Sequence, residues 1–200
     1  MYHQIKYRWV VIAWVILALV GWMGSYKLNQ TYTVSYELPK PQVTIIPTIR
    51  YTAPPKPSKT DKLARAISDI YTSVDVTKAK QIVKLTEHHA NKHNISPTLV
   101  LGLIAAESSF KRTAVSHVGA KGYTQVYPKW HHDKIKGRDL FDTRVSIEVG
   151  TRILKDCFDR RKTVKMALAC YNGATRPEDI EKYYRSVMRR KQQILQVAAL

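Results

Sequence analysis

The sequence predicts a mainly α-helical domain that follows an N-terminal membrane span and a proline-rich linker. Residues 9–24 form an apolar run without a single charge, and six prolines lie between Pro39 and Pro57. From Asp61 onward, apolar residues recur at spacings near 3.6 residues, and alternating patterns are scarce. A 3.6-residue apolar period is typical of helices that bury one face, so the chain after residue 60 is expected to be helical.

The apolar run has the features of an uncleaved membrane anchor. With its aromatic flanks, the run over 9–24 is just long enough to cross a bilayer, for which about 17 to 20 apolar residues suffice. Lys6 and Arg8 precede it and place the N-terminus in the cytoplasm. A cleaved signal peptide is the alternative, but no A-x-A-like site follows the run. We therefore expect a cytoplasmic N-terminus over 1–8, a transmembrane anchor over 9–26, and a periplasmic remainder.

Residues 27–60 are interpreted as a linker rich in proline and lysine. Dense proline prevents helices and favours an extended backbone. Two stretches could pair with the sheet edge of a partner. In 32–38 large apolar or aromatic residues occupy every second position, and 43–46 consists of β-branched residues. The semi-extended spacer is the favoured interpretation. Such a linker also offers a contact site for partners in an envelope complex or a virion.

Several helices are expected after the linker. The first follows from the apolar spacing after Asp61, and the second extends from about Thr77, as its N-cap, to His93. The third is the best marked, because Ser96 suits an N-cap and Pro97 suits the first helical position. This third helix is apolar almost all round, which is typical of the buried centre of a domain. Weaker helical patterns cover 144–158, 163–171 and 177–195.

The chain is strongly basic, with 33 Lys and Arg against 15 Asp and Glu and a formal net charge of +18. Such a charge attracts anionic partners, namely nucleic acid, a membrane face or a cell-wall polymer. No helix-turn-helix or aromatic-basic platform accompanies it, so no nucleic-acid partner is expected. The basic runs 160–162 and 189–191 are interpreted as solvated helix faces.

No metal or other cofactor is expected. Cys157 and Cys170 lack a zinc-binding spacing; they could pair outside the cytoplasm, but buried free thiols are the favoured interpretation. The second predicted helix carries three histidines, His88, His89 and His93. His89 and His93 are four residues apart, a spacing that can bind a metal, but the sequence offers no third ligand at a matching position. A solvated helix face is therefore the interpretation for these histidines.

Glu107 is the candidate for acid–base chemistry, since it stands at the end of the apolar third helix. Burial disfavours the charged form of a carboxyl and raises its pKa, which suits a general acid. The alternative is a glutamate that turns outward to solvent where the helix ends.

Two later segments carry further candidates. Gly119 and Gly122 permit a tight turn or close approach to a ligand, and Gln125 can bind sugar hydroxyls through its amide. Tyr171 and Asn172 stand side by side where a later helix ends.

In their order and spacing, these segments resemble the motifs of the soluble-type lytic transglycosylases, whose SLT domain has a lysozyme-like fold. The E-S motif of the family matches Glu107-Ser108, and its S-x-x-G-A-x-G-L-M-Q motif matches the segment 116–125. The A-L-A-A-Y-N motif matches 167–172 with one change, Cys170, and the late tyrosine of the fourth motif matches Tyr183. The D-L-F-D stretch at 139–142 matches as well, and the resemblance covers roughly residues 80 to 190.

Three short segments depart from the family pattern. Tyr123-Thr124 replace Leu-Met, which is expected to reshape the cleft wall. Ser146 replaces an Asn, and Gly173-Ala174 replace A-G. None of these changes removes a group that transfers a proton.

The resemblance implies a lysozyme-like catalytic domain over 61–200, with its core at 77–190, that cleaves peptidoglycan glycan strands. Glu107 would protonate the oxygen between N-acetylmuramic acid (MurNAc) and N-acetylglucosamine (GlcNAc), then take the proton of the C6 hydroxyl as a 1,6-anhydro ring closes. A goose-type lysozyme hydrolase and a catalytically weak wall-binding scaffold are the alternatives. The residues expected to bind substrate are Ser108, Gly119, Gly122, Tyr123, Gln125, Tyr171, Asn172 and Tyr183.

Overall fold

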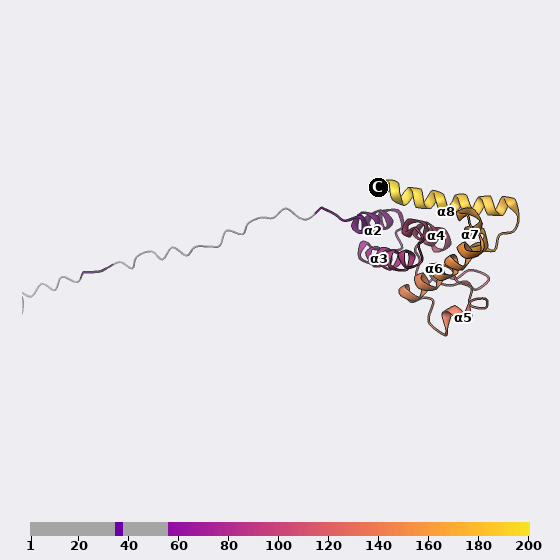
Figure 1. Ribbon diagram of the computed structural model, residues 1–200. Helices are drawn as coiled ribbons and strands as arrows, with labels where there is room; N and C mark the ends of the chain where they lie inside the picture. Colours follow the sequence, from indigo (N-terminus) through magenta and orange to yellow (C-terminus); the bar gives the residue numbers. More distant parts are fainter. Residues whose placement is uncertain (1–34, 38–55) are drawn as a thin grey trace, which may run out of the picture. The chain divides into compact units, whose positions relative to one another are not determined.

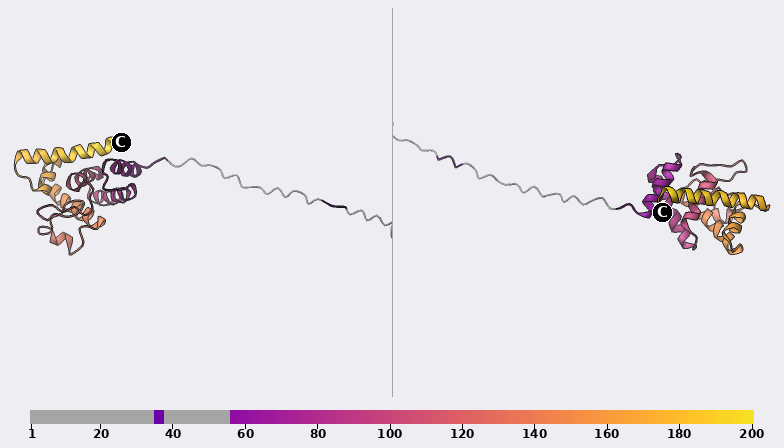
Figure 2. Two further views of the ribbon diagram at one scale, coloured as in Figure 1. Left: turned by 180° about the vertical axis from the view of Figure 1, so that it is seen from behind. Right: turned by 90° about the horizontal axis from the view of Figure 1, so that it is seen from above.

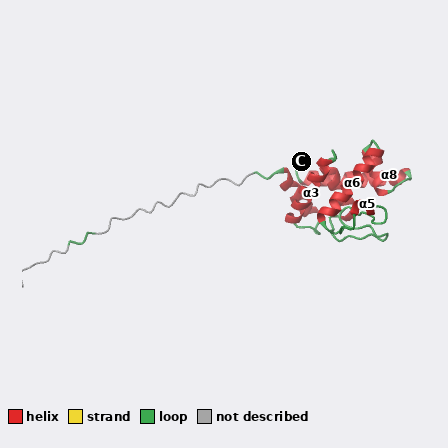
Figure 3. Ribbon diagram, turned by 60° about the horizontal axis from the view of Figure 1, so that its bottom comes forward, coloured by secondary structure: helices red, strands yellow, loops and turns green. Residues whose placement is uncertain are grey.

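The computed structural model describes residues 35–37 and 56–200, and the latter range is helical as expected (Figures 1 and 3). Loops fill most of the segment between α4 and α6, where only α5 is helical (Figure 3). Two isolated β-bridges, Val115 with Lys121 and Lys121 with Val126, fix a turn in that segment. The helices are α2 (Lys59–Ile70), α3 (Val76–Lys92), α4 (Pro97–Ser108), α5 (His132–Ile135), α6 (Thr143–Arg160), α7 (Val164–Asn172) and α8 (Pro177–Val197).

Helix α4 is the buried centre of this domain, as its apolar composition predicts. Leu101, Leu103 and Ile104 have no exposed surface. The long helix α8 packs along α4 and also contacts α7 and α2, so it runs along one side of the domain (Figures 1 and 2). The surrounding helices thus hold the C-terminal end of α4 in place.

The first two helices begin earlier than the sequence pattern predicts. Ser58 caps α2 and forms a capping box with Asp61, so Lys59 and Thr60 are helical and not part of the linker. The N-cap of α3 is Asp75, not Thr77. The Asp75 carboxylate accepts a hydrogen bond from Lys78 N at 2.9 Å, and its charge is also favourable at the helix N-terminus.

The interpretation of the α3 histidines as a solvated face is wrong for His89. Helix α3 packs against α2, α4 and α6, so it buries more than one face. The His89 side chain is only 8% exposed and meets the ring of His88 edge to face, with 4.8 Å between centroids. Burial lowers the pKa of His89 below its ordinary value, which favours the neutral imidazole.

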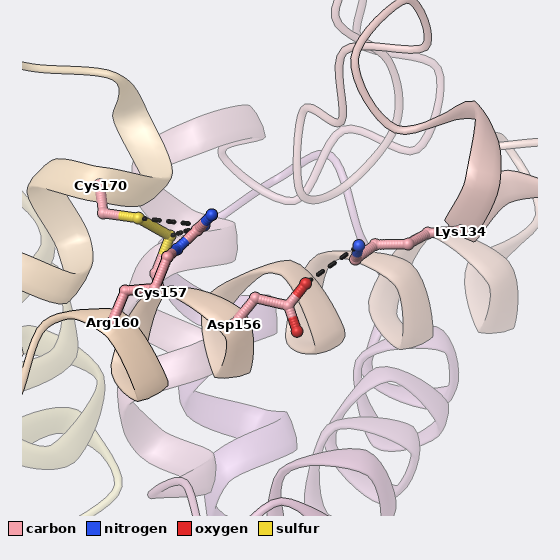
Figure 4. Close-up of a disulfide and its surroundings, with 5 residues drawn as sticks. All are labelled: Lys134, Asp156, Cys157, Arg160 and Cys170. Carbon is pink, nitrogen blue, oxygen red and sulfur yellow. Dashed lines mark hydrogen bonds and ion pairs between the residues drawn. A yellow bond between two sulfur atoms is a disulfide. The ribbon is translucent and has the colours of Figure 1, made fainter.

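Cys157 on α6 and Cys170 on α7 form a disulfide, so the favoured prediction of free thiols is wrong. Helices α6 and α7 are joined by a short turn and pack together, which brings the two Cα atoms to 5.7 Å. The Arg160 guanidinium lies 3.6 and 3.5 Å from the two sulfurs (Figure 4). Beside it, Lys134 of α5 pairs with Asp156 at 3.0 Å (Figure 4).

The two basic runs differ in exposure. The run 160–162 is exposed, in agreement with the predicted solvated helix face, whereas Arg190 and Lys191 of the second run are half-buried.

We predict that the disulfide stabilises the domain. Replacing Cys157 and Cys170 together with Ala should lower the free energy of unfolding by about 2–3 kcal/mol, because a cross-link over a short loop restricts the unfolded chain. Urea unfolding of both proteins, with and without a reducing agent, measures this. Reduction should lower the unfolding midpoint of the wild type and leave that of the variant unchanged. Equal effects of reductant on both would contradict the prediction.

The predicted anchor over 9–26 lies outside the described residues, as does most of the predicted linker. Within the described part of the chain, no helix combines the length and the apolar character needed to cross a bilayer.

Candidate active site

Glu107 is the last residue but one of α4, and its carboxyl faces a pocket of about 390 Å³. The pocket lies between the end of α4, the loop segment before α5, and parts of α6 and α7. Its lining residues are Glu107, Ser116, Val118, Ala120, Gln125, Val126, Tyr127, Trp130, His131, Ile153, Tyr171 and Asn172.

Burial raises the pKa of Glu107 from 4.5 to about 7. The Tyr183 hydroxyl, on α8, donates a hydrogen bond to Glu107 Oε1, and this bond lowers the pKa and offsets part of the effect of burial. Near neutral pH, the protonated and the ionised forms of the carboxyl are therefore both populated. A group that first gives a proton and then accepts one needs both forms.

Two tyrosines flank the carboxyl as neutral hydrogen-bond donors. Burial raises the pKa of Tyr171 and of Tyr183 above the ordinary value, and the charge of Glu107 adds to the effect. Tyr171 donates its hydroxyl proton to Thr124 O at 2.7 Å, which ties α7 to the loop segment. Asn172 follows at the end of α7, exposed at the pocket rim.

Gln125 is held in the pocket wall with its amide oxygen unused. Its Nε2 donates to Ala114 O at 3.0 Å and to Gly122 O at 3.1 Å. Neither bond involves Oε1, so that oxygen can accept a hydrogen bond from a ligand hydroxyl.

Five of the residues predicted to bind substrate do not line this pocket, namely Ser108, Gly119, Gly122, Tyr123 and Tyr183, although the Tyr183 hydroxyl bonds to Glu107. Ser108 is buried, and its hydroxyl donates to Ile104 O at 3.1 Å and Tyr123 O at 2.8 Å, so it joins the loop segment to α4. Tyr123 is 2% exposed and belongs to the core. In this structure both residues thus lie in the packed interior and not in the lining of the pocket.

The two glycines of the motif shape the loop instead of contacting the pocket. Gly119 has a φ of +89°, which suits a turn residue without a side chain. Gly122 has a φ of +78°, and a Cβ there would lie 2.2 Å from Leu140 O. The backbones of the loop segment and of the stretch before α6 can approach only because this residue is glycine.

Two departures from the family pattern contact each other. Thr124 is fully buried and donates its hydroxyl proton to Ser146 O at 2.8 Å, while Ser146 Oγ accepts from Thr124 N at 3.3 Å. Gly150, one turn further along α6, makes room, since a Cβ there would lie 2.4 Å from Thr124 Oγ1. Neither Tyr123 nor Thr124 lines the pocket, and the change at Thr124 adds a buried polar contact between the loop segment and α6.

Glu107 is the only carboxyl among the residues that line this pocket. Asp139 and Asp142, which stand in the D-L-F-D stretch, have structural partners. Asp139 accepts from Phe141 N at 2.8 Å, and Asp142 caps α6 by accepting from Val145 N at 2.9 Å. The residues that line the pocket can therefore supply one carboxyl for acid–base chemistry.

The sequence suggests His131-His132, beside Trp130, as a sugar contact at the cleft rim, although a loop without a binding role is the favoured interpretation; His131 and Trp130 line the pocket. Tyr127 and Ile153 also line it and were not singled out. For Tyr127 the aromatic cluster 127–131 is the available signal, because exposed aromatics in loops often bind ligands.

Known proteins resemble the region that builds this pocket. The family model of the transglycosylase SLT domain matches residues 84–195. Membrane-bound lytic murein transglycosylase C of Actinobacillus pleuropneumoniae is 38% identical over 64 residues, which are 32% of this chain and 16% of that protein. The transglycosylase of Enterobacteria phage PRD1 is 32% identical over 84 residues, 42% of this chain and 31% of that protein.

Among solved structures, the 70 kDa soluble lytic transglycosylase of Escherichia coli is similar, with 20% identity and a TM-score of 0.45. That match covers 70% of this chain and 27% of the other. The chain thus spans less than a third of the length of each of these three relatives. Because the family model covers more than half of the sequence, including α4, the loop segment and α7, this chain belongs to the transglycosylase SLT domain family.

Proposed function

We propose that this protein is a lytic transglycosylase that cleaves the β-1,4 bond between MurNAc and GlcNAc in peptidoglycan without water. The observation that supports this best is a single carboxyl, Glu107, in a pocket with no second acid, whose pKa burial raises to about 7. Hydrolytic glycosidases mostly use two carboxyl groups, the second of which holds water or attacks the sugar. Here only one such group is available.

The reaction proceeds in two proton transfers through Glu107. In its protonated form the carboxyl gives its proton to the bridging oxygen, and the bond from that oxygen to C1 of MurNAc breaks. The N-acetyl group of the sugar stabilises the positive centre at C1. The carboxylate then takes the proton of the C6 hydroxyl as O6 bonds to C1, which restores the acid and closes the 1,6-anhydro ring.

Neighbouring residues hold the acid and the substrate in this proposal. The Tyr183 hydroxyl fixes Glu107 Oε1 and stabilises the carboxylate formed between the two transfers. Gln125 Oε1 and the exposed Asn172 amide bind sugar hydroxyls or the acetamido groups. Tyr171 keeps the end of α7 against the loop segment.

The proposal extends to the place of action. The segment 9–26 anchors the chain in the membrane with the catalytic domain in the periplasm, and the linker connects the two. One relative is itself called membrane-bound and another belongs to a phage, so an envelope complex or a virion is the setting we favour. The net charge of +18 assists attachment to an anionic wall or membrane.

We predict that digestion of purified sacculi releases anhydro products. An intramolecular C6 hydroxyl competes at an effective molarity of about 10⁵ M or more when well oriented, far above that of bulk water. Each terminal muropeptide should therefore weigh about 18 daltons less than the hydrolytic product, the mass of one water that ring closure does not add. Mass spectrometry before and after borohydride treatment measures this, since an anhydro end resists reduction.

Two other product patterns point to the alternatives. Mostly reducible muropeptides would show a goose-type hydrolase, with Asp139 or Asp142 released from its structural bond to hold water. Tight binding to sacculi without any released product would show a wall-binding scaffold.

A further inference from the structure

The pocket beside Glu107 carries an exposed aromatic surface that the acid–base chemistry does not use. Within 56–200, Trp130 is the most exposed of the large apolar residues, at 72%. It lines the same pocket as Glu107, and so does Val118, which is 57% exposed. An indole left in solvent at the mouth of a catalytic pocket is more typical of a ligand contact than of a fold determinant.

The exposed indole packs against a neighbouring ring on a hydrogen-bonded turn. The Tyr127 ring meets it edge to face, with 5.0 Å between centroids and 80° between planes. The backbone closes a turn around Pro128, because Trp130 N donates to Tyr127 O at 3.2 Å and His131 N donates to Pro128 O at 3.3 Å. A side chain that is already ordered loses little entropy when a ligand covers it.

The flat face of an indole matches one class of ligand well. The axial C–H bonds of a pyranose ring form an apolar, slightly positive face, and the face of an aromatic ring is negative. The hydroxyls at the ring edge still need hydrogen-bond partners, which the pocket provides through Ser116, Gln125 and His131. Burial lowers the pKa of His131, so its imidazole is neutral at neutral pH and can both donate and accept.

We propose that Trp130, braced by Tyr127, forms a stacking subsite for one pyranose ring of the glycan strand, next to the ring that Glu107 acts on. This inference rests on the proposed function for the identity of the strand, but it concerns binding and not proton transfer. It makes Trp130 a specificity-determining residue that favours chains longer than the two sugars at the cleaved bond.

The other three tryptophans of the chain, Trp9, Trp14 and Trp22, allow a direct test. Replacing these three with Phe leaves Trp130 as the sole indole of the full-length chain, which can be studied in detergent micelles. Adding Glu107→Gln prevents turnover during the titration. Soluble glycan strands freed of their peptides should then change the emission of Trp130 in a saturable manner, and free GlcNAc should not.

Substitutions at the platform separate stacking from structure. Trp130→Ala should weaken glycan binding about tenfold or more, as removal of an aromatic stacking surface does, whereas Trp130→Tyr should retain most of it. In the active chain, Trp130→Ala should raise KM with little change in kcat, since it removes binding common to the ground and transition states. Met166→Ala is the control, because Met166 is an exposed apolar residue of α7 that does not line the pocket.

The possible results distinguish this inference from the proposed function. Cleavage with an unchanged KM for Trp130→Ala, or glycan binding without a change in Trp130 emission, would overturn the stacking subsite and leave the activity standing. Saturable quenching in a chain that releases no product would support the subsite and contradict the activity. A loss of binding in Met166→Ala as large as that in Trp130→Ala would also overturn it.

Discussion

Replacing Glu107 with Gln is expected to slow the release of muropeptides from sacculi by about 10²–10⁴-fold, the usual contribution of a general acid–base group. The amide has the size of the carboxyl and can still accept the hydrogen bond from Tyr183, but it has no proton to give at neutral pH. No other carboxyl lines the pocket, so no second carboxyl there can take over the proton transfers. Product release is measured by chromatography, and circular dichroism checks that the helices remain.

Glu178→Gln is the matched control for this experiment. Its side chain is 66% exposed in the first turn of α8 and does not line the Glu107 pocket. It should therefore retain wild-type activity. A Glu107→Gln rate within tenfold of wild type would show that another group performs the proton transfers.

The helices could largely be predicted from the sequence, because their apolar faces and start signals are local. Ser96 and Pro97 mark the start of α4, and its apolar surface all round predicts the burial that the structure confirms. The start of α3 was missed because both Asp75 and Thr77 are acceptable N-caps, and only the geometry selects between them. The Cys157–Cys170 disulfide depends on which faces of α6 and α7 meet, which no local pattern contains.

Of the residues singled out in the sequence, Glu107, Gln125, Tyr171 and Asn172 line the pocket, whereas Ser108 and Tyr123 are buried beside it. Consecutive helix residues point about 100° apart, so Glu107 can face the pocket while Ser108 faces the core. The motif sequence alone does not show which of two adjacent residues faces the pocket and which faces the core. The same holds for Tyr123, whose place beside Gln125 in the motif suggests a ligand contact, although its ring is buried.

Most of the residues that line the pocket come from a segment without regular structure. Tyr127, Trp130 and His131 lie between α4 and α5 and line the pocket together with Glu107, so their position depends on how this loop segment folds. Such folding depends on contacts distant in sequence, among them the bond from Tyr171 to Thr124 O. Periodicity carries no information about contacts of this kind.

Glu107→Gln should also change the pH dependence of stability, in a direction fixed by the raised pKa. The carboxyl titrates at about 7 in the folded protein and near its ordinary value of 4.5 in the unfolded chain. Between these pH values the folded protein keeps a proton that the unfolded chain has released, so the free energy of unfolding falls as pH rises. Below 4.5 both states are protonated and this cost is absent. Above 7 the full cost remains, about 3 kcal/mol on the basis of 1.36 kcal/mol for each pKa unit.

The amide does not titrate, so Glu107→Gln should gain stability relative to wild type by about 3 kcal/mol between pH 4 and pH 8. Urea unfolding of both proteins across this range measures the difference, in which the titration of all shared groups cancels. Glu178→Gln should show no such gain, because that carboxyl is exposed. Parallel stability curves for wild type and Glu107→Gln would mean that Glu107 is as well solvated in the folded protein as in the unfolded chain. A gain of the expected size, together with lost activity, would show that the burial that makes Glu107 an acid near neutral pH also destabilises the fold.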